Sequence, residues 1–399
     1  MTMVSIKPFI PSNELPEDQD IEGKLLKVLT LDAALNASFP EPMRNAMERV
    51  LFLVNSYYSN KIEGNPTLPM DLVDPPHQAP TEDSNQNLQE INRNMEVQVK
   101  EAYSMVDESA ITTKEFISNL HEEFFKGLPD SALLTEPNSE GVREQIVPGH
   151  FRVRDVKVGI HVPIDHTMIN SFMEWFRLSY RPSYVHGLNK LLAAAASHHR
   201  LVWCHPFLDG NGRVCRMFTD LYMRQSGVVG YGLWSMSRGF ARDTQNYYRM
   251  LQKADMPRQG DYDGTGELSD KGLLNFTNYF LETAVDQLEF FTSLFETKGL
   301  RSRIKQYFDA RSKGVSLHPN AQGLPALRIE AKIVFMHLFD EGPSTQAELR
   351  DETGLSKHVL SECLAQMKAE ELVIAPHKQP VCLSLNRECI PSLFPKLII

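Results

Sequence analysis

The sequence has few cysteines and no long hydrophobic run. Its five cysteines are odd in number and form no C-x-x-C pair, which favours reduced, buried thiols in a reducing compartment. Residues 1–8 lack the apolar segment of a signal peptide. The most apolar stretch, residues 191–196, is far shorter than the roughly 20 residues that span a bilayer. These features predict a soluble cytoplasmic protein that makes no membrane contact.

Basic residues are outnumbered by acidic ones. With 41 Lys and Arg against 51 Asp and Glu, the net charge is −10. Because contacts with nucleic-acid phosphates need clustered Lys and Arg, such a chain is a poor general nucleic-acid binder, although a local basic patch is compatible with this balance. At 399 residues, the chain is too long for one compact core and is expected to form two or three domains.

Apolar residues recur at helical spacing along most of the chain. The first such segment is 42–63, where Pro42 suits a first turn and Gly64 with Pro66 ends the helix. Another helix is expected directly after residue 212. Further helices are expected at about 86–106, 114–126, 187–203, 241–255, 270–298, 327–340 and 357–369. The sequence therefore predicts a mainly α-helical fold.

Two short segments have a different pattern. Residues 142–163 show partial alternation of apolar and polar side chains with a turn at Pro148, which predicts a short β-hairpin. Near the end of the chain, residues 373–374 and 381–383 flank a turn and follow three helical segments. The order helix, helix, turn, helix, wing predicts a winged helix-turn-helix.

A run of twelve residues, His205 to Arg216, reads HPFLDGNGRVCR. Its Gly-Asn-Gly turn at 210–212 permits sharp bending of the backbone and exposes N–H groups just before a helix. Such a helix N-terminus binds anions such as phosphate. Arg213 and Arg216 share one face of that helix, where two guanidinium groups are suited to hold a di- or triphosphate.

Two more side chains complete this run. Asp209 stands beside the predicted phosphate site, where a carboxylate usually indicates Mg²⁺. His205 has an ordinary pKa of about 6.5, so it can accept a proton from a hydroxyl near neutral pH. Each part alone is usually structural, because turns, helix-end histidines and solvated arginines are common. Their occurrence together in this order favours a functional site.

The run matches every specified position of H-x-F-x-(D/E)-G-N-G-R-x-x-R, the signature of the Fic family, and the chain resembles that family over about residues 40–260. The resemblance implies an all-helical core that transfers AMP from ATP to a Ser, Thr or Tyr hydroxyl of a protein. It implies that His205 is the general base and that Asp209 holds Mg²⁺. The residues implied to bind the nucleotide phosphates are Gly210, Asn211, Gly212, Arg213 and Arg216.

The resemblance bears on the kind of reaction and on the substrates. Relatives that phosphorylate carry Lys at the position of Gly212, so this glycine favours nucleotidyl transfer. The segment 147–160 resembles the family's flap, which holds a target segment by main-chain pairing. Tyr247 and Tyr248 resemble a pair near the adenosine, with Tyr248 as the expected contact, but two core aromatics on a helix are an equally open interpretation. Self-modification and a homodimer are left open.

Residues 59–64 resemble the family's inhibitory motif, (S/T)-x-x-x-E-(G/N). Ser59 and Glu63 are four residues apart and therefore lie on the same face of a helix. In the family, this glutamate pairs with the second arginine of the signature, here Arg216, and blocks the productive position of the γ-phosphate. The resemblance thus implies autoinhibition by an N-terminal helix within the same chain. The same carboxylate could also position a water that removes AMP.

The predicted elements divide the chain into three parts. Residues 1–110 form an N-terminal helical region with the inhibitory helix at 42–63, residues 111–298 form the Fic core, and residues 299–399 form the winged-helix domain. Residues 341–371 hold more acidic than basic side chains. Protein contact is therefore a rival to DNA binding as the task of the last domain.

Three hypotheses about function follow. The first is an autoinhibited protein adenylyltransferase that uses ATP and Mg²⁺. The second is a transcriptional regulator whose Fic core only senses a nucleotide, and His205 argues against it because a pure sensor needs no base. The third is a toxin-like binding partner, and the built-in Glu63 argues against dependence on a separate antitoxin chain.

Overall fold

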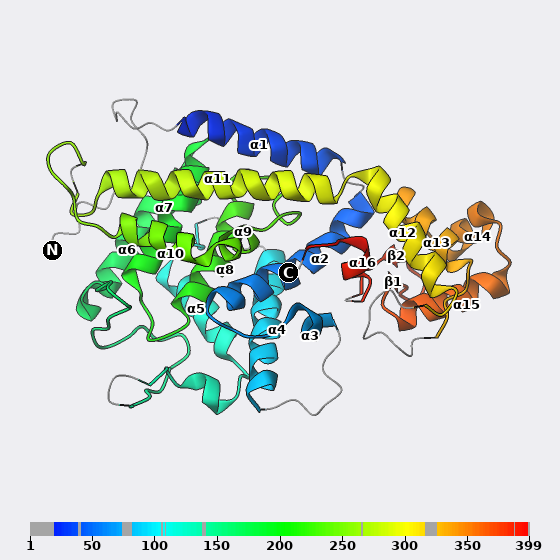
Figure 1. The fold of residues 1–399 in the computed structure, drawn as a ribbon, viewed down its shortest axis with the longest axis horizontal. Coiled ribbons are helices and arrows are strands. Elements are labelled where there is room, and N and C mark those ends of the chain that lie inside the picture. The colour runs from blue at the N-terminus through cyan, green and yellow to red at the C-terminus, as the bar shows by residue number, and fades with distance from the viewer. Residues whose placement is uncertain are drawn as a thin grey trace.

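The computed structural model describes residues 20–38, 41–73, 82–104, 107, 109–137, 141–264, 266–315, 325–386 and 388–397. Residues 1–8, on which the signal-peptide argument rests, lie outside this range. The described chain is mainly helical, as predicted (Figure 1). Within it, no helix has both the length and the apolar character that crossing a bilayer requires.

The described residues before the Fic-signature region form helices that lead into the bundle. The first of them are α1 Ile21–Ser38, α2 Glu41–Ile62, α3 Pro69–Val73 and α4 Glu82–Tyr103. Helix α2 agrees with the helix predicted at 42–63, whereas α1 has no counterpart among the predicted helices. Figure 1 shows α1 lying along α11, and the two helices contact each other through buried residues of α1 such as Leu25 and Val28.

The middle of the chain forms a bundle. Its helices are α5 Lys114–Phe125, α6 Ile169–Tyr180, α7 Asn189–Cys204, α8 Asn211–Arg224, α9 Met236–Arg242, α10 Thr244–Ala254 and α11 Asp270–Leu294, with short 3₁₀ helices at Asp130–Leu133, His166–Met168 and Pro182–Tyr184. Helix α8 lies at the centre, and all but two of its 14 residues are buried. Four consecutive buried alanines, 193–196, let α7 approach its neighbours closely.

Two predicted helices differ in detail. The helix expected at 241–255 is interrupted at Asp243, whose carboxylate accepts from the backbone N of Asn246 at 3.0 Å and so caps α10. The helix expected at 270–298 ends at Leu294, because Glu296 caps a new helix, α12. Both breaks arise from acidic side chains that satisfy the free N–H groups of a helix start.

The predicted hairpin at 142–163 is reduced to isolated pairs. Within this segment, single antiparallel bridges join Val158 to His161 and Gln145 to Leu134. The segment is instead held by Arg152, whose Nε donates to the backbone O of His205 at 2.8 Å and whose backbone N donates to the O of Pro206 at 2.9 Å. Contacts with the end of α7 therefore replace strand pairing.

The last part of the chain contains α12 Thr297–Arg311, α13 Ala331–Asp340, α14 Gln346–Thr353, α15 Lys357–Ala369, β1 Val373–Ile374, β2 Cys382–Leu383 and α16 Ile390–Leu393. The strands β1 and β2 pair antiparallel. Thr345 and Glu348 form a capping box at the start of α14, and Gly354 ends that helix with φ of 69°. The element order is the one expected for a winged helix-turn-helix, and that assignment stays a prediction. The division of the chain into three parts also stays a prediction. Its boundary at 298–299 falls in the first turn of α12.

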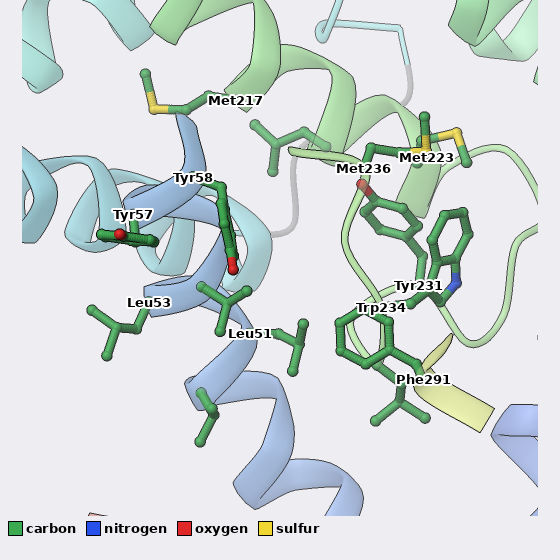
Figure 2. Packing of buried hydrophobic residues seen from close by; sticks show 14 of the residues in the cluster. Leu51, Leu53, Tyr57, Tyr58, Met217, Met223, Tyr231, Trp234, Met236 and Phe291 are labelled. Carbon is green, nitrogen blue, oxygen red and sulfur yellow. The ribbon is translucent and has the colours of Figure 1, made fainter. Parts of the chain in front are cut away.

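The segment after α8 is tied to α1 by one buried carboxylate. Asp32 accepts from the backbone N of Gly230 at 2.8 Å and from Nε1 of Trp234 at 2.9 Å. Burial raises the pKa of Asp32, and these donors oppose that effect. Figure 2 shows Trp234 and Tyr231 packed beside Phe291 in the same part of the core.

Replacing Asp32 by Ala should destabilise the fold. The change leaves two buried donors without their acceptor, so we expect the free energy of unfolding to fall by about 3 kcal/mol. Urea unfolding followed by circular dichroism measures this change. Glu22→Ala, which removes an exposed carboxylate from the same helix, should alter the free energy by less than about 0.5 kcal/mol. Equal effects of the two substitutions would contradict the assignment.

Candidate active site

The motif forms the connection between α7 and α8. His205 ends α7 in a left-handed conformation with φ of 48°, and Gly210 precedes α8 with φ of 77°. A Cβ on Gly210 would lie 2.9 Å from Cε2 of Phe125, so a side chain is excluded by space as well as by backbone conformation. Two reversals of the chain thereby place His205 beside the N-terminus of α8.

Asn211 holds this connection in shape. Its Oδ1 accepts from the backbone N of Phe207 and its Nδ2 donates to the O of Phe207, both at 2.9 Å. Because both ends of the side chain are used within the loop, the amide of Asn211 fixes the turn that precedes α8. A direct contact of Asn211 with phosphate stays a prediction.

Arg216 is buried and is held by the last turn of α2. Its Nε donates to Oγ of Ser59 at 2.9 Å, and its NH2 donates to the O of Ser59 at 2.9 Å and to Oε1 of Glu63 at 2.5 Å. Burial alone would lower the pKa of Arg216, but the Glu63 carboxylate together with Tyr247 and Tyr248 outweighs this effect and raises that pKa. The contact predicted between Glu63 and Arg216 is therefore present in the structure.

The same carboxylate covers Gly212. A Cβ built on this glycine would overlap Oε1 of Glu63 and would lie 2.9 Å from its Cδ. A carboxylate oxygen of Glu63 thus lies over the backbone at the start of α8, where exposed N–H groups favour negative charge. Glu63 stands where a phosphate group would be expected.

Arg213 has a different set of partners from Arg216. Its NH1 contacts Oε2 of Glu90 on α4 at 2.9 Å, and its NH2 contacts Oδ1 of Asp209 at 3.3 Å. The guanidinium also lies over the ring of Phe124, 4.9 Å from its centroid. Arg213 does not line the cavity described below, whereas Arg216 does. A joint clamp by both arginines is not assembled in this arrangement.

Asp209 is accessible at the edge of the site. Its side chain is 42% exposed, and the hydrogen bonds recorded among the described residues engage Oδ1. The second oxygen is therefore available to a cation. Mg²⁺ is commonly held by one or two carboxylates together with substrate phosphates, so a single accessible carboxylate beside a phosphate site fits this ion.

His205 has an altered protonation equilibrium. Burial lowers its pKa to about 4, the charges of His161 and Arg152 act in the same direction, and Asp209 and Glu63 oppose them. The ordinary pKa of about 6.5 assumed from the sequence is therefore wrong for this site. The imidazole is neutral at pH 7, which is the form that accepts a proton.

A cavity of about 380 Å³ brings together Glu63, His205, Asn211, Gly212 and Arg216, whereas Asp209 and Arg213 do not line it. Its volume lies in the range of small-molecule sites. It is lined by Glu63, Val158, Gly159, Ile160, His161, Val202, Trp203, His205, Asn211, Gly212, Arg216, Tyr247, Tyr248, Leu251, Gln252 and Asp255. The hydroxyl of Tyr248 donates to the O of Ile62 at 3.1 Å, whereas Tyr247 is buried and its hydroxyl lies 2.8 Å from Nε2 of His198. Tyr248 therefore borders the cavity, and Tyr247 belongs chiefly to the core.

Residues 111–223 match the model of the Fic/DOC family. The chain contains a Fic/DOC domain. Among curated proteins, it is 27% identical over 224 residues to a protein adenylyltransferase Fic of Nematostella vectensis, covering 53% of this chain and 45% of that protein. It is 34% identical over 84 residues to the protein of the same name from Drosophila willistoni, covering 21% of this chain and 17% of the relative. The chain thus spans less than half the length of these relatives.

The fold is shared more widely than the sequence. A Fic family protein from Desulfovibrio desulfuricans superimposes with a TM-score of 0.50 at 15% identity, covering 95% of this chain and 98% of the other. At this identity the likeness concerns the fold alone. It extends beyond the Fic/DOC domain to nearly the whole chain.

Several residues around the Fic/DOC domain's cavity were not anticipated. His161 lies 3.4 Å from Oδ2 of Asp255, whose Oδ1 lies 3.0 Å from Nε2 of His199. Glu90, the partner of Arg213, is another residue that the sequence analysis did not anticipate. The only sequence signal for His161 was its place next to the predicted flap, and no local pattern distinguishes Asp255 or Glu90 from surface carboxylates.

The buried histidines His121 and His205 of the Fic/DOC domain should make the stability of the fold depend on pH. Burial lowers the pKa of both His121 and His205 to about 4. The unfolded chain therefore binds more protons between pH 6.5 and 4, so the free energy of unfolding should fall as the pH falls through this window. Each group should contribute on the order of 3 kcal/mol by pH 4.

Urea unfolding at several pH values, with NMR titration of the His ring protons, measures this effect. His358→Gln is the control, because the side chain of His358 is 82% exposed and its loss should not change the pH profile. Titration of the ring protons of His121 and His205 near pH 6.5 would show that these histidines are not held neutral.

Proposed function

We propose that this chain is a protein adenylyltransferase that transfers AMP from ATP to a Ser, Thr or Tyr hydroxyl, and that Glu63 holds it inactive. The observation that carries the proposal is the pairing of Glu63 with Arg216 directly over Gly212. His205, Asn211, Gly212 and Arg216 line the cavity, and the Glu63 carboxylate covers the end at which phosphate would bind. The names of the curated relatives support the same activity at a coarse level.

The proposed reaction uses His205 as the base. Its neutral imidazole takes the proton from the target hydroxyl, and the hydroxyl oxygen forms a bond to the α-phosphorus of ATP. The bond between that phosphorus and the bridging oxygen breaks, and pyrophosphate leaves. The N–H groups at the start of α8 stabilise the charge on the phosphate oxygens. Mg²⁺ held by Asp209 would neutralise further phosphate charge.

Inhibition follows from competition between anions. Arg216 is the buried cation that faces the cavity, and Glu63 already satisfies it. A γ-phosphate can reach Arg216 in a productive arrangement only if Glu63 withdraws, because two anions on one site repel each other. Glu63 is 32% exposed and stands just after α2, so it has room to withdraw. The same carboxylate could direct a water in the reverse reaction, and this direction is part of the proposal.

The target would lie against segment 147–160. Apolar side chains on this segment and just beyond it are exposed, with Val153 at 84% and Ile160 at 74%. Few of its backbone groups pair with other strands, since its pairing is limited to isolated bridges. An extended target segment could therefore add hydrogen bonds along this backbone. Val158 and Ile160 also line the cavity, which would bring such a segment close to His205.

The alternative, a regulator that senses a nucleotide without chemistry, remains the second hypothesis. A sensor needs a binding cavity but no general base. The presence of His205 in the cavity wall favours an enzyme. Self-modification, a homodimer and DNA binding by residues 299–399 stay untested predictions about partners.

Removal of Glu63 should activate the protein. With Mg²⁺ and ATP labelled at the α-phosphate, Glu63→Gly should incorporate much more label into protein than wild type does. Glu63→Gly/His205→Ala should lose this incorporation by about 100-fold or more, because it lacks the base. ATP labelled at the γ-phosphate should leave the protein unlabelled.

Glu41→Gly provides a matched control, since it replaces an exposed glutamate at the other end of α2 and should not activate. Equal labelling of Glu63→Gly and wild type would overturn the inhibitory assignment. Label that appears on protein only from the γ-phosphate would show phosphorylation instead of AMP transfer.

A further inference from the structure

Segment 390–397, at the far end of the described chain, contacts the inhibitory helix α2 and has four buried apolar residues, Ile390, Leu393, Phe394 and Leu397. The hydroxyl of Tyr58 on α2 donates to the backbone O of Leu397 at 3.2 Å. Tyr58 immediately precedes Ser59, one of the two residues that hold Arg216. Figure 1 shows α16 beside α2, and Figure 2 shows Tyr58 projecting from α2 toward the core. Segment 390–397 therefore reaches the last turns of α2.

Arg238 fixes this segment from the opposite side. This α9 residue is 2% exposed, and it donates through Nε to the O of Leu397 at 3.2 Å and through NH2 to the O of Lys396 at 3.0 Å. Its NH1 donates to Oε1 of Gln287 on α11 at 3.0 Å. One carbonyl, that of Leu397, thus accepts from both α2 and α9.

The rest of the segment is anchored by further contacts. Nε of Arg303 on α12 donates to the O of Leu393 at 2.6 Å. The rings of Phe394 and Phe295 pack edge to face with centroids 5.7 Å apart. Leu397 is fully buried, so this is not a frayed end. Segment 390–397 accordingly joins α2 to α9, α11 and α12.

The hydrogen bonds of the buried Arg238 go to main-chain carbonyls, and their main effect is to fix the position of residues 396 and 397. Its guanidinium is rigid and planar, so the carbonyls of residues 396 and 397 are fixed in direction. The carbonyl of Leu397 then fixes the hydroxyl of Tyr58. The adjoining turn of α2 carries Ser59, and Glu63 follows it directly; the bonds of both residues to Arg216 depend on a close fit.

We propose that segment 390–397 positions the last turns of α2, with Tyr58 and Arg238 as positioning residues for the pairing of Glu63 with Arg216. The inference rests on the proposed inhibitory role of Glu63. When the segment is released, α2 loses the hydrogen bond from Tyr58 to Leu397 and Glu63 leaves Arg216 more often. Because the segment follows β2, and α2 also contacts β2 and α13, the C-terminal part of the chain sets the strength of inhibition.

The test compares Tyr58→Phe and Arg238→Gln in two backgrounds. With Glu63 present, Tyr58→Phe should raise incorporation of α-phosphate label about three- to tenfold, the range expected for loss of one hydrogen bond. Arg238→Gln should raise it further, because it loses several bonds. In the Glu63→Gly background, neither substitution should add to the activity. A merely structural role would lower activity in both backgrounds.

Tyr57→Phe is the matched control. Tyr57 is a buried neighbour on the same helix, and its hydroxyl makes no recorded hydrogen bond to segment 390–397 among the described residues. Its replacement should leave the labelling unchanged. Tyr58→Phe keeps the ring and its packing against Tyr57, so it should keep the fold even where Arg238→Gln unfolds the protein.

Hydrogen exchange of the amides of residues 58–63 gives a second readout that does not depend on catalysis. Tyr58→Phe should speed exchange there, and Tyr57→Phe should not. Unchanged exchange, or equal activation with and without Glu63, would overturn the inference. If Glu63→Gly is not activated while exchange at 58–63 does increase in Tyr58→Phe, the positioning stands and the proposed function of Glu63 fails.

Discussion

The buried guanidinium of Arg216 is the constraint on which the arrangement of the site depends. A cation withdrawn from water must be paired and hydrogen-bonded, and α2 supplies both needs through Ser59 and Glu63. Helix α2 must therefore lie against α8, and it is held there by contacts with α4 and α9. The geometry that satisfies Arg216 is also the geometry that places a carboxylate over Gly212.

The same burial sets the chemistry of the base. Withdrawal of His205 from water lowers its pKa to about 4, so it is neutral at pH 7 without needing a special partner. The cavity thus combines a neutral imidazole, a buried cation and the N-terminal end of a helix dipole. Two of these favour an anion, and in this structure the chain's own Glu63 meets that preference.

Many of the helices could be predicted from the sequence, because a helix depends on residues that are close together along the chain. Helices α2, α5, α8 and α15 were predicted within a few residues, since each has a clear apolar stripe and a defined start or stop. Of the predicted hairpin at 142–163, the structure has an isolated antiparallel bridge between Val158 and His161, and Arg152 ties the segment to the end of α7, which alternation cannot reveal. Helix α1 was missed, although its packing along α11 is extensive.

The sequence by itself determined that the glycine turn, the histidine and the two arginines of His205 to Arg216 gather at the start of one helix, because they are close together along the chain. With a family resemblance, it also predicted the partner of Arg216. Only the tertiary structure decided that Arg213 pairs with Glu90, that Asp255 reaches His161, and that Leu397 meets Tyr58. These pairs lie from 94 to 339 positions apart and depend on how whole helices pack, so no local period encodes them.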